Sequence, residues 1–296
     1  VEELIKLGKS KGYVTYDDGN ERLDGDVTEA DLATAPAALR HDYEQAVQHA
    51  RTAGERLNAQ FGRALLLGPW QGLAELTGQA ATLTGCEPPP WLTLGGAAFG
   101  QAEVTLEAFE RMAACDPLRV TPLSQIARLY LWLGQPAEAV RHAKAVLERV
   151  DDYIMPQALV IGLAFSGDAE GAERAAARHI RNEDELLLAR ALAAAIRGDG
   201  AASADYQQAY LGTHGPDDYF ALILAALRGN RNEANRLAAA IDGRPFGHVV
   251  LLDAIFMCFC GAPFDLEATP AFAAMLAESG LAWPPAKPYD LPLKDW

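Results

Sequence analysis

Seven glycines recur along the chain at nearly constant intervals, and this repeat constrains the fold more than any other feature. The intervals are 32, 34, 33, 31, 31 and 32 residues. The glycines are Gly68, Gly100, Gly134, Gly167, Gly198, Gly229 and Gly261. Between them the sequence is apolar and alanine-rich with few β-branched runs, which favours helices. The spacing predicts stacked helical hairpins, because one such hairpin cannot bury its apolar face alone.

The unit around Gly134 shows the predicted hairpin most clearly. Ile126 and Leu129 stand at helical spacing before the glycine, and Pro136 follows it at a position that suits the first turn of a second helix. Ala139 lies five residues after the glycine, where a small side chain lets two helices approach closely. A small residue holds this offset in five consecutive units, at Thr105, Ala139, Ala172, Ser203 and Ala234.

This pattern resembles the tetratricopeptide repeat family. Tyr130 stands where that motif has the aromatic residue of its first helix, Gly134 is at the turn, and Ala139 is at the helix crossing. In the preceding unit, Phe109 falls on the aromatic position of the second helix and Pro117 on the terminating proline. The resemblance implies an all-α fold, a right-handed α-α superhelix of about six helical hairpins.

The resemblance covers about residues 53–280 and leaves both ends of the chain outside it. We expect a short acidic helical head over residues 1–34, the repeat domain over residues 35–280, and a tail over residues 281–296. Four prolines keep the tail extended, and its tryptophan and tyrosine side chains predict that it packs on the last repeats.

The head resembles the acidic amino-terminal region of primary bacterial sigma factors. The resemblance covers residues 1–31, and Gly19 departs from the usual apolar residue. The matching positions are Gly12, Tyr13, Val14, Thr15, Tyr16, Asp17 and Asn20. In sigma factors this region is an acidic mimic that keeps DNA out of its channel. Here it carries nine acidic and four basic residues, a net charge of −5. A sigma-like regulatory role and a fused remnant without separate function are both left open.

In tetratricopeptide arrays the first helix of each unit lines the concave face, and the residue six positions before the turn glycine points into it. That row is Gly62, Leu94, Arg128, Ile161, Leu192 and Ile223. An apolar row with one cation predicts an apolar protein or peptide partner with one acidic group for Arg128.

Two further residues were weighed for the same groove. Trp132 is either a contact anchor or packs against the adjacent unit. Asn58 alone hints at the clamp for acidic carboxyl-terminal peptides, which needs repeated lysine and asparagine, so that reading is rejected. The candidate groove residues are therefore Asn58, Leu94, Arg128, Trp132, Ile161, Leu192 and Ile223.

Composition narrows the class of partner and the compartment. A net charge of −15 disfavours nucleic acid and anionic membranes, and no apolar run reaches the roughly 18 residues that span a bilayer. The amino terminus lacks the apolar core of a signal peptide. Four scattered cysteines suit a reducing compartment and are expected to be free thiols. We therefore expect a cytoplasmic protein, bacterial from its alanine and arginine bias.

No catalytic, cofactor-binding or metal-binding residues are expected. The sequence lacks a GxSxG nucleophile elbow, a phosphate-binding GxxxxGK loop and an HExxH zinc helix. His41 and His49 flank Glu44, but eight residues of helix span about 12 Å, too far for a shared ion.

These features predict a protein-interaction scaffold rather than an enzyme. One alternative is a regulator of transcription or signalling that is autoinhibited by its head or tail. A second is an enzyme in the superhelix groove, which predicts a cluster of polar groups with perturbed pKa values. Nothing in the sequence indicates an oligomeric state.

Overall fold

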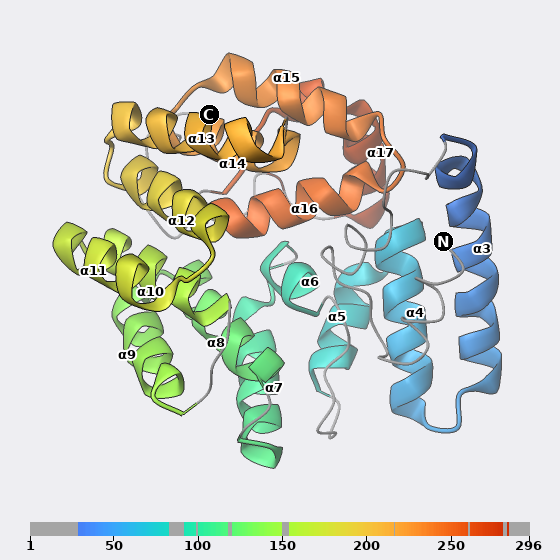
Figure 1. Ribbon diagram of the computed structural model, residues 1–296. Helices are drawn as coiled ribbons and strands as arrows, with labels where there is room; N and C mark the ends of the chain where they lie inside the picture. The colour runs from blue at the N-terminus through green and yellow to red at the C-terminus, as the bar shows by residue number, and fades with distance from the viewer. Residues whose placement is uncertain are drawn as a thin grey trace.

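The computed structural model describes residues 29–82, 92–98, 100–117, 120–149, 154–215, 217–259, 261–280 and 283. Within these residues the chain forms fifteen α-helices and one short 3₁₀ helix, and no β-strand (Figure 1). The prediction of an all-α fold is confirmed.

The helices are named in chain order as in Figure 1. They are α3 (Glu29–His49), α4 (Ala53–Leu67), α5 (Leu73–Ala81), α6 (Leu92–Ala98), α7 (Ala102–Cys115), α8 (Val120–Trp132), α9 (Pro136–Leu147), α10 (Ile154–Phe165), α11 (Ala169–His179), α12 (Glu183–Ile196), α13 (Gly200–His214), α14 (Asp218–Leu227), α15 (Arg231–Asp242), α16 (Gly247–Cys258), the 3₁₀ helix η1 (Leu266–Ala268) and α17 (Pro270–Ser279).

Five of the predicted turns, at Gly100, Gly134, Gly167, Gly198 and Gly229, share one local structure, in which the backbone N–H after the glycine donates to the carbonyl five residues earlier. All seven repeat glycines have positive φ, a region where a side chain is strained. At Gly167, where φ is 78°, the backbone N–H of Asp168 donates to the carbonyl of Leu163 at 3.0 Å and ends α10. The Asp168 carboxylate then accepts from the backbone N–H of Gly171 at 2.8 Å and caps α11. One residue pair thus ends one helix and begins the next.

The small residues after the turns lie where the helices cross. Their relative exposure is 0% in every case, at Thr105, Ala139, Ala172, Ser203 and Ala234. A close approach is seen at Gly96 of α6, where an added Cβ would stand 2.1 Å from Thr105 Oγ1 of α7. The predicted close packing of the hairpins is therefore confirmed.

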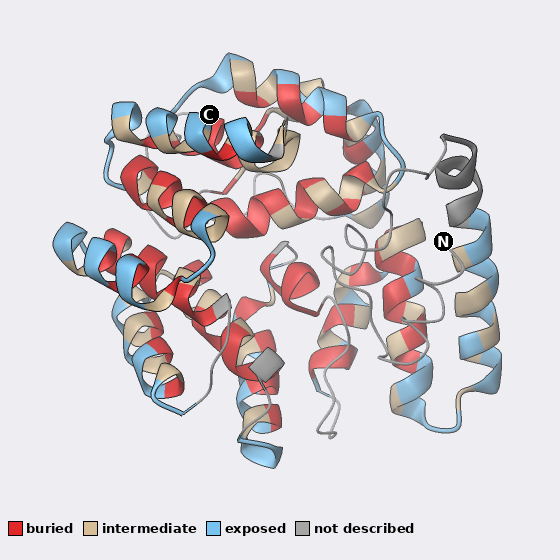
Figure 2. Ribbon diagram, in the orientation of Figure 1, coloured by how far each residue is buried: buried red, intermediate tan, exposed pale blue. Residues whose placement is uncertain are grey.

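The hairpins form an inner and an outer layer (Figure 1). The inner helices α6, α8, α10, α12, α14 and α16 each pack against the next in the series, whereas α7, α9, α11, α13 and α15 pack outside them. Figure 2 shows buried residues concentrated on the inner helices and exposed residues on the outer ones. The result is an α-α superhelix.

The inner layer closes on itself because α16 also packs against α6. Aromatic pairs then fill its interior: Trp132 of α8 lies 6.0 Å from Phe256 of α16, and Phe165 of α10 lies 5.9 Å from Phe259, measured between ring centroids. The helices α10, α14 and α16 are predominantly apolar, with only one or two polar residues each. Such helices are stable only when every face is covered, which explains the closure.

Trp70, between α4 and α5, joins the beginning of the described chain to its end. Its ring is fully buried, 5.8 Å from that of His248 on α16 and 5.5 Å from that of Phe272 on α17. The His248 Nε2–H donates to the carbonyl of Leu66 at 2.9 Å. Desolvation lowers the pKa of His248, which keeps the ring neutral at pH 7.

The structure describes only part of the chain around the two expected segment boundaries, at residues 34–35 and 280–281. Helix α3 begins at Glu29 and runs through the boundary between residues 34 and 35. Trp283 packs its ring 5.6 Å from that of Phe264 and 5.7 Å from that of Phe272. The rest of the tail lies outside the described residues, so its packing stays a prediction.

The expectation of free thiols is wrong at the two described cysteines. Cys115 and Cys258 are both disulfide-bonded. Disulfides are rare in the cytoplasm, so the expected location does not follow from the cysteines and stays a prediction. Among the described helices, none has the length and apolar character needed to cross a bilayer.

Candidate functional site

Most of the predicted groove residues lie on the inner helices, with Asn58 and Gly62 on α4, but the chain itself covers them. Five have relative exposures of 5% or less: Leu94, Trp132, Ile161, Leu192 and Ile223. Gly62 is covered by Tyr43, whose ring would stand 2.9 Å from an added Cβ. Asn58 is half-buried, with a buried Oδ1 that has no hydrogen-bond partner among the described residues. The row is therefore not an open groove in this structure.

Helix α16 is the element that fills the interior at Trp132. Freeing it would expose Leu252, Ile255 and Phe256, each worth about 1.5–3 kcal/mol when buried. The sum is comparable with the roughly 5–15 kcal/mol that stabilises a whole domain. Partner binding through the inner row stays a prediction. It would require α16 to be displaced, at a free-energy cost of the size given above.

Arg128 interacts electrostatically with an acidic group of the same chain. It lies near Tyr219 of α14 and Asp253 of α16, and the Tyr219 hydroxyl donates to Asp253 Oδ2. Desolvation raises the pKa of Asp253 and raises that of Tyr219 well above 10, while the positive charge of Arg128 lowers both pKa values in part. An apolar helix with one carboxylate opposite Arg128 is the partner chemistry predicted above, supplied here by α16.

Sequence reasoning named Arg128 but missed the other two members of this cluster. The available signal was one acidic residue, Asp253, in the otherwise apolar run GHVVLLDAIFMC. The enzyme alternative predicts a polar cluster of this kind. In this cluster the Tyr219 hydroxyl already donates its hydrogen bond to Asp253, which favours a structural role for the cluster.

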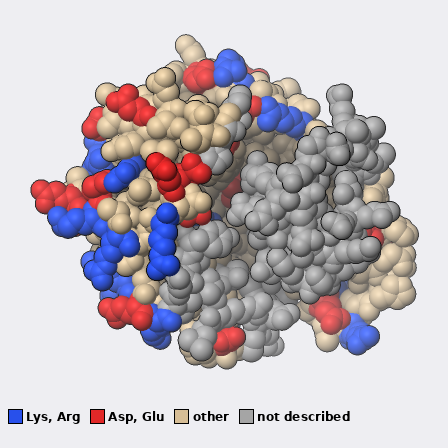
Figure 3. Space-filling model, in the orientation of Figure 1, with Lys and Arg blue, Asp and Glu red and all other residues tan. Residues whose placement is uncertain are grey.

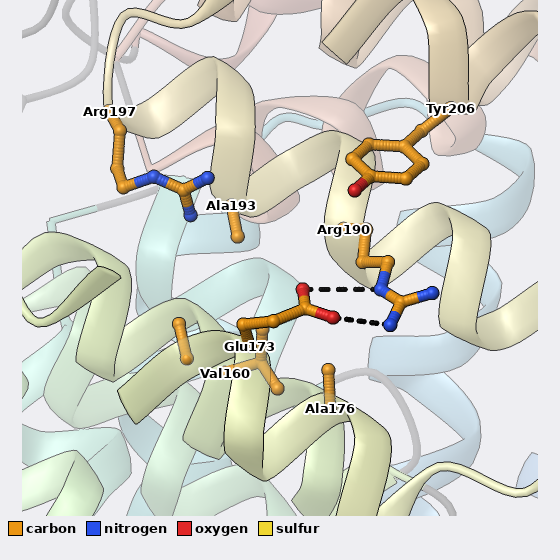
Figure 4. Close-up of a pocket in the computed structure, with 8 residues that line it drawn as sticks. Val160, Glu173, Ala176, Arg190, Ala193, Arg197 and Tyr206 are labelled. Atoms are coloured by element: carbon orange, nitrogen blue, oxygen red, sulfur yellow. Dashed lines mark hydrogen bonds and ion pairs between the residues drawn. The ribbon is translucent and has the colours of Figure 1, made fainter. Parts of the chain in front are cut away.

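A second polar site lies on the outside, where α11, α12 and α13 meet (Figure 4). We call it the α12 notch. Small side chains form its floor and longer polar ones its rim, so the surface is recessed between neighbouring hairpins. It is lined by Val160, Ala172, Glu173, Ala176, Arg190, Ala193, Arg197 and Tyr206.

Arg190 is held in the α12 notch by two contacts. Its Nε donates to Glu173 Oε2 at 3.2 Å and its Nη2 donates to Glu173 Oε1. The guanidinium also lies 5.9 Å from the centre of the Tyr206 ring, within range of a cation–π interaction. The hydrogen bond that Arg190 donates to Glu173 is the main cause that raises the pKa of Arg190. A side chain only 25% exposed is thus fixed in one orientation.

Arg197 stands on the same rim without such a partner. It is exposed, and it directly follows the last residue of α12. Among the described residues, neither the Arg197 guanidinium nor the Tyr206 hydroxyl makes a hydrogen bond. Sequence reasoning missed this site, although Arg190 and Arg197 stand seven residues apart and therefore on one face of a helix.

The rest of the described surface has no comparable feature. The one exposed large hydrophobic side chain in the described part of the chain is Val104, at 38% exposure. Figure 3 shows the face of the molecule seen in Figure 1, and acidic and basic side chains are interleaved on its described part. No apolar docking patch is therefore present among the described residues.

Comparisons with known proteins add information mainly on the head. Residues 1–33 match the family described as Sigma-70 factor, region 1.1, which confirms the resemblance of the head. Of these, only residues 29–33 are described, at the start of α3. No curated protein matches the chain. One solved structure that resembles it is titled "Crystal structure of PilW, widely conserved type IV pilus biogenesis factor", with 16% identity, a TM-score of 0.36, and coverage of 76% of this chain and 100% of that one. A score this low does not establish a shared fold.

Proposed function

We propose that this chain is a protein-interaction scaffold that binds its partner on the outer face of the helical hairpins. The observation that carries the proposal is the contrast between the two layers. The inner row is covered by α16, whereas the outer α12 notch presents an exposed arginine without a partner among the described residues.

The repeated turn supports this role. A buried small residue brings the two helices of each hairpin together, and the inner helices of neighbouring hairpins pack against each other, so the outer helices are held in a regular array. The tetratricopeptide-like pattern of turn glycine and crossing residue supports a peptide or protein as the partner. A rigid outer face lowers the entropy cost of binding.

Site-specific photocrosslinking with the full chain tests the proposal. Benzoylphenylalanine is placed at Ala177, exposed on α11 beside the notch, or at Ala46, exposed on α3 as the matched control. We expect one protein from the native cell extract to crosslink at Ala177 and not at Ala46. Purified, that protein must form the complex again. Equal labelling at both positions, or none at either, would contradict a specific outer-face partner.

A regulatory role is the second candidate, and the match of residues 1–33 to sigma region 1.1 favours it. The covering helix α16 belongs to neither the head nor the tail, so autoinhibition by either one has to act elsewhere. The test compares promoter retention by RNA polymerase with the full chain and with a chain that lacks residues 1–28. A head-dependent change supports regulation, and equal retention at micromolar protein removes it.

A further inference from the structure

We propose that the α12 notch binds the side-chain carboxylate of a glutamate or aspartate on the partner protein. This inference rests on the proposed scaffold function and names the chemistry of its docking point. The notch combines two guanidinium groups, one phenol hydroxyl and the carboxylate of Glu173, which lies between the two arginines (Figure 4).

The donors needed for a carboxylate are present and only partly used. A guanidinium has five N–H donors, and Glu173 accepts from two nitrogens of Arg190, which leaves donors on that side chain. The Arg197 guanidinium and the Tyr206 hydroxyl make no hydrogen bond to any described residue. Charge-assisted hydrogen bonds from such groups are about twice as strong as neutral ones.

The charge of the notch favours an anion. Arg190 and Arg197 carry two positive charges against the single negative charge of Glu173, and the bidentate pair with Arg190 occupies that carboxylate. The chain as a whole has a net charge of −15, so a local excess of positive charge is an exception on this protein. It would select one acidic side chain rather than a broadly acidic surface.

The shape of the notch favours a side chain on a protein rather than a free anion. The notch is partly open to solvent, and its volume of about 20 Å³ has room for about one oxygen-sized group. The side chains of Ala172, Ala176 and Ala193 are buried beneath the notch, so a ligand would contact mainly the polar groups of its rim. Arg190 is already held by Glu173 and Tyr206, so little conformational entropy is lost when a ligand binds.

The test titrates the ¹⁵N-labelled full chain with a capped hexapeptide that has two central glutamates, and with the same peptide carrying two glutamines. We expect the glutamate peptide to shift the amide signals of residues 190–197 and 206, and the glutamine peptide to leave them in place. A similar response to both peptides overturns the proposal. Competition by inorganic phosphate at the same concentration as the glutamate peptide would also overturn the proposal, because the site would then bind any free anion.

Three variants assign the donors. Arg197→Ala should weaken glutamate-peptide binding about tenfold, the equivalent of about 1.4 kcal/mol. Tyr206→Phe keeps the ring over Arg190 and removes only the hydroxyl, and should weaken binding several-fold. Arg178→Ala removes the same charge from an exposed position on α11 outside the notch and should have no effect. Unchanged binding by the Arg197 variant, or equal loss in the Arg178 variant, contradicts the proposal.

Photocrosslinking separates this inference from the scaffold function. One outcome would contradict the carboxylate site and leave the scaffold function intact. In that outcome the chain with Arg197 does not bind the glutamate peptide, yet benzoylphenylalanine at Ala177 still captures the partner in the Arg197→Ala chain. If the chain that carries benzoylphenylalanine at Ala177 and keeps Arg197 also captures no partner, the scaffold function is contradicted. Arg197 is exposed, so its alanine variant should keep the melting temperature of the parent chain.

Discussion

The indole ring of Trp70 stands edge-on to the ring of Phe272, with centroids 5.5 Å apart and planes at 89°. This contact joins the first described hairpin to the last helix, so the superhelix is closed rather than open-ended. Trp70 Nε1 donates to the carbonyl of Leu65 at 3.2 Å, which satisfies its buried N–H.

Replacing this indole should destabilise the whole fold. Trp70→Ala leaves a cavity at a fully buried position and should cost about 3–5 kcal/mol in the free energy of unfolding. Val104→Ala, at the exposed position on α7, should change it by less than about 0.5 kcal/mol. Urea unfolding followed by circular dichroism measures both. Similar small effects would mean that Trp70 does not hold the ends together.

The turn glycines should be required for their φ angle and not for space. At both Gly167 and Gly200 an added Cβ meets nothing within 4 Å, but only Gly167 has a positive φ, of 78°. Gly167→Ala should therefore destabilise by about 1–2 kcal/mol. Gly200→Ala, at the start of α13, should be neutral or stabilise by up to about 1 kcal/mol. Equal losses in thermal unfolding would refute the turn assignment.

The carboxyl of Asp253 should make stability depend on pH. Its pKa is raised in the folded chain, mainly by desolvation, so the folded state holds this proton more tightly than the unfolded state. Its contribution to stability is present below the ordinary pKa of aspartate and is lost as the pH rises through the raised value. Asp253→Asn should therefore stabilise the chain at pH 7 relative to the parent, with a smaller difference near pH 4. A variant that is less stable than the parent only at pH 7 would show that Arg128 dominates instead.

The state of the cysteines can be read directly. Cys115 and Cys258 should resist iodoacetamide in the denatured chain without reductant and react after reduction, because both are disulfide-bonded. Mass spectrometry of the chain purified under thiol-blocking conditions measures the labelling. Full labelling before reduction would restore the free thiols and the reducing compartment that the sequence suggested.

The hairpins could be predicted from sequence because their signals are local. Gly134 and Ala139 sit five residues apart, and that offset both turns the chain and brings the two helices into contact. Positive φ and close crossing each demand a specific kind of residue, so the repeat is visible without any long-range information.

The closure could not be predicted in the same way. It depends on small rotations between neighbouring hairpins that accumulate over the array, and the spacing of turns does not report them. A partial signal was present, since α10, α14 and α16 are predominantly apolar and an open groove would leave apolar surface exposed. The α12 notch was missed for a related reason: Glu173 and Arg190 come from different helices, and only the fold brings them together.

Hydrogen exchange of the α16 amides is the most direct measurement of whether the interior is permanently filled. If α16 is an integral part of the core, its buried amides should exchange only by global unfolding, with the same opening free energy as those of α10 in the same inner layer. An α16 that exchanges at a much lower opening free energy than α10 would contradict this, because the inner row would then open to a partner while the rest of the chain stays folded.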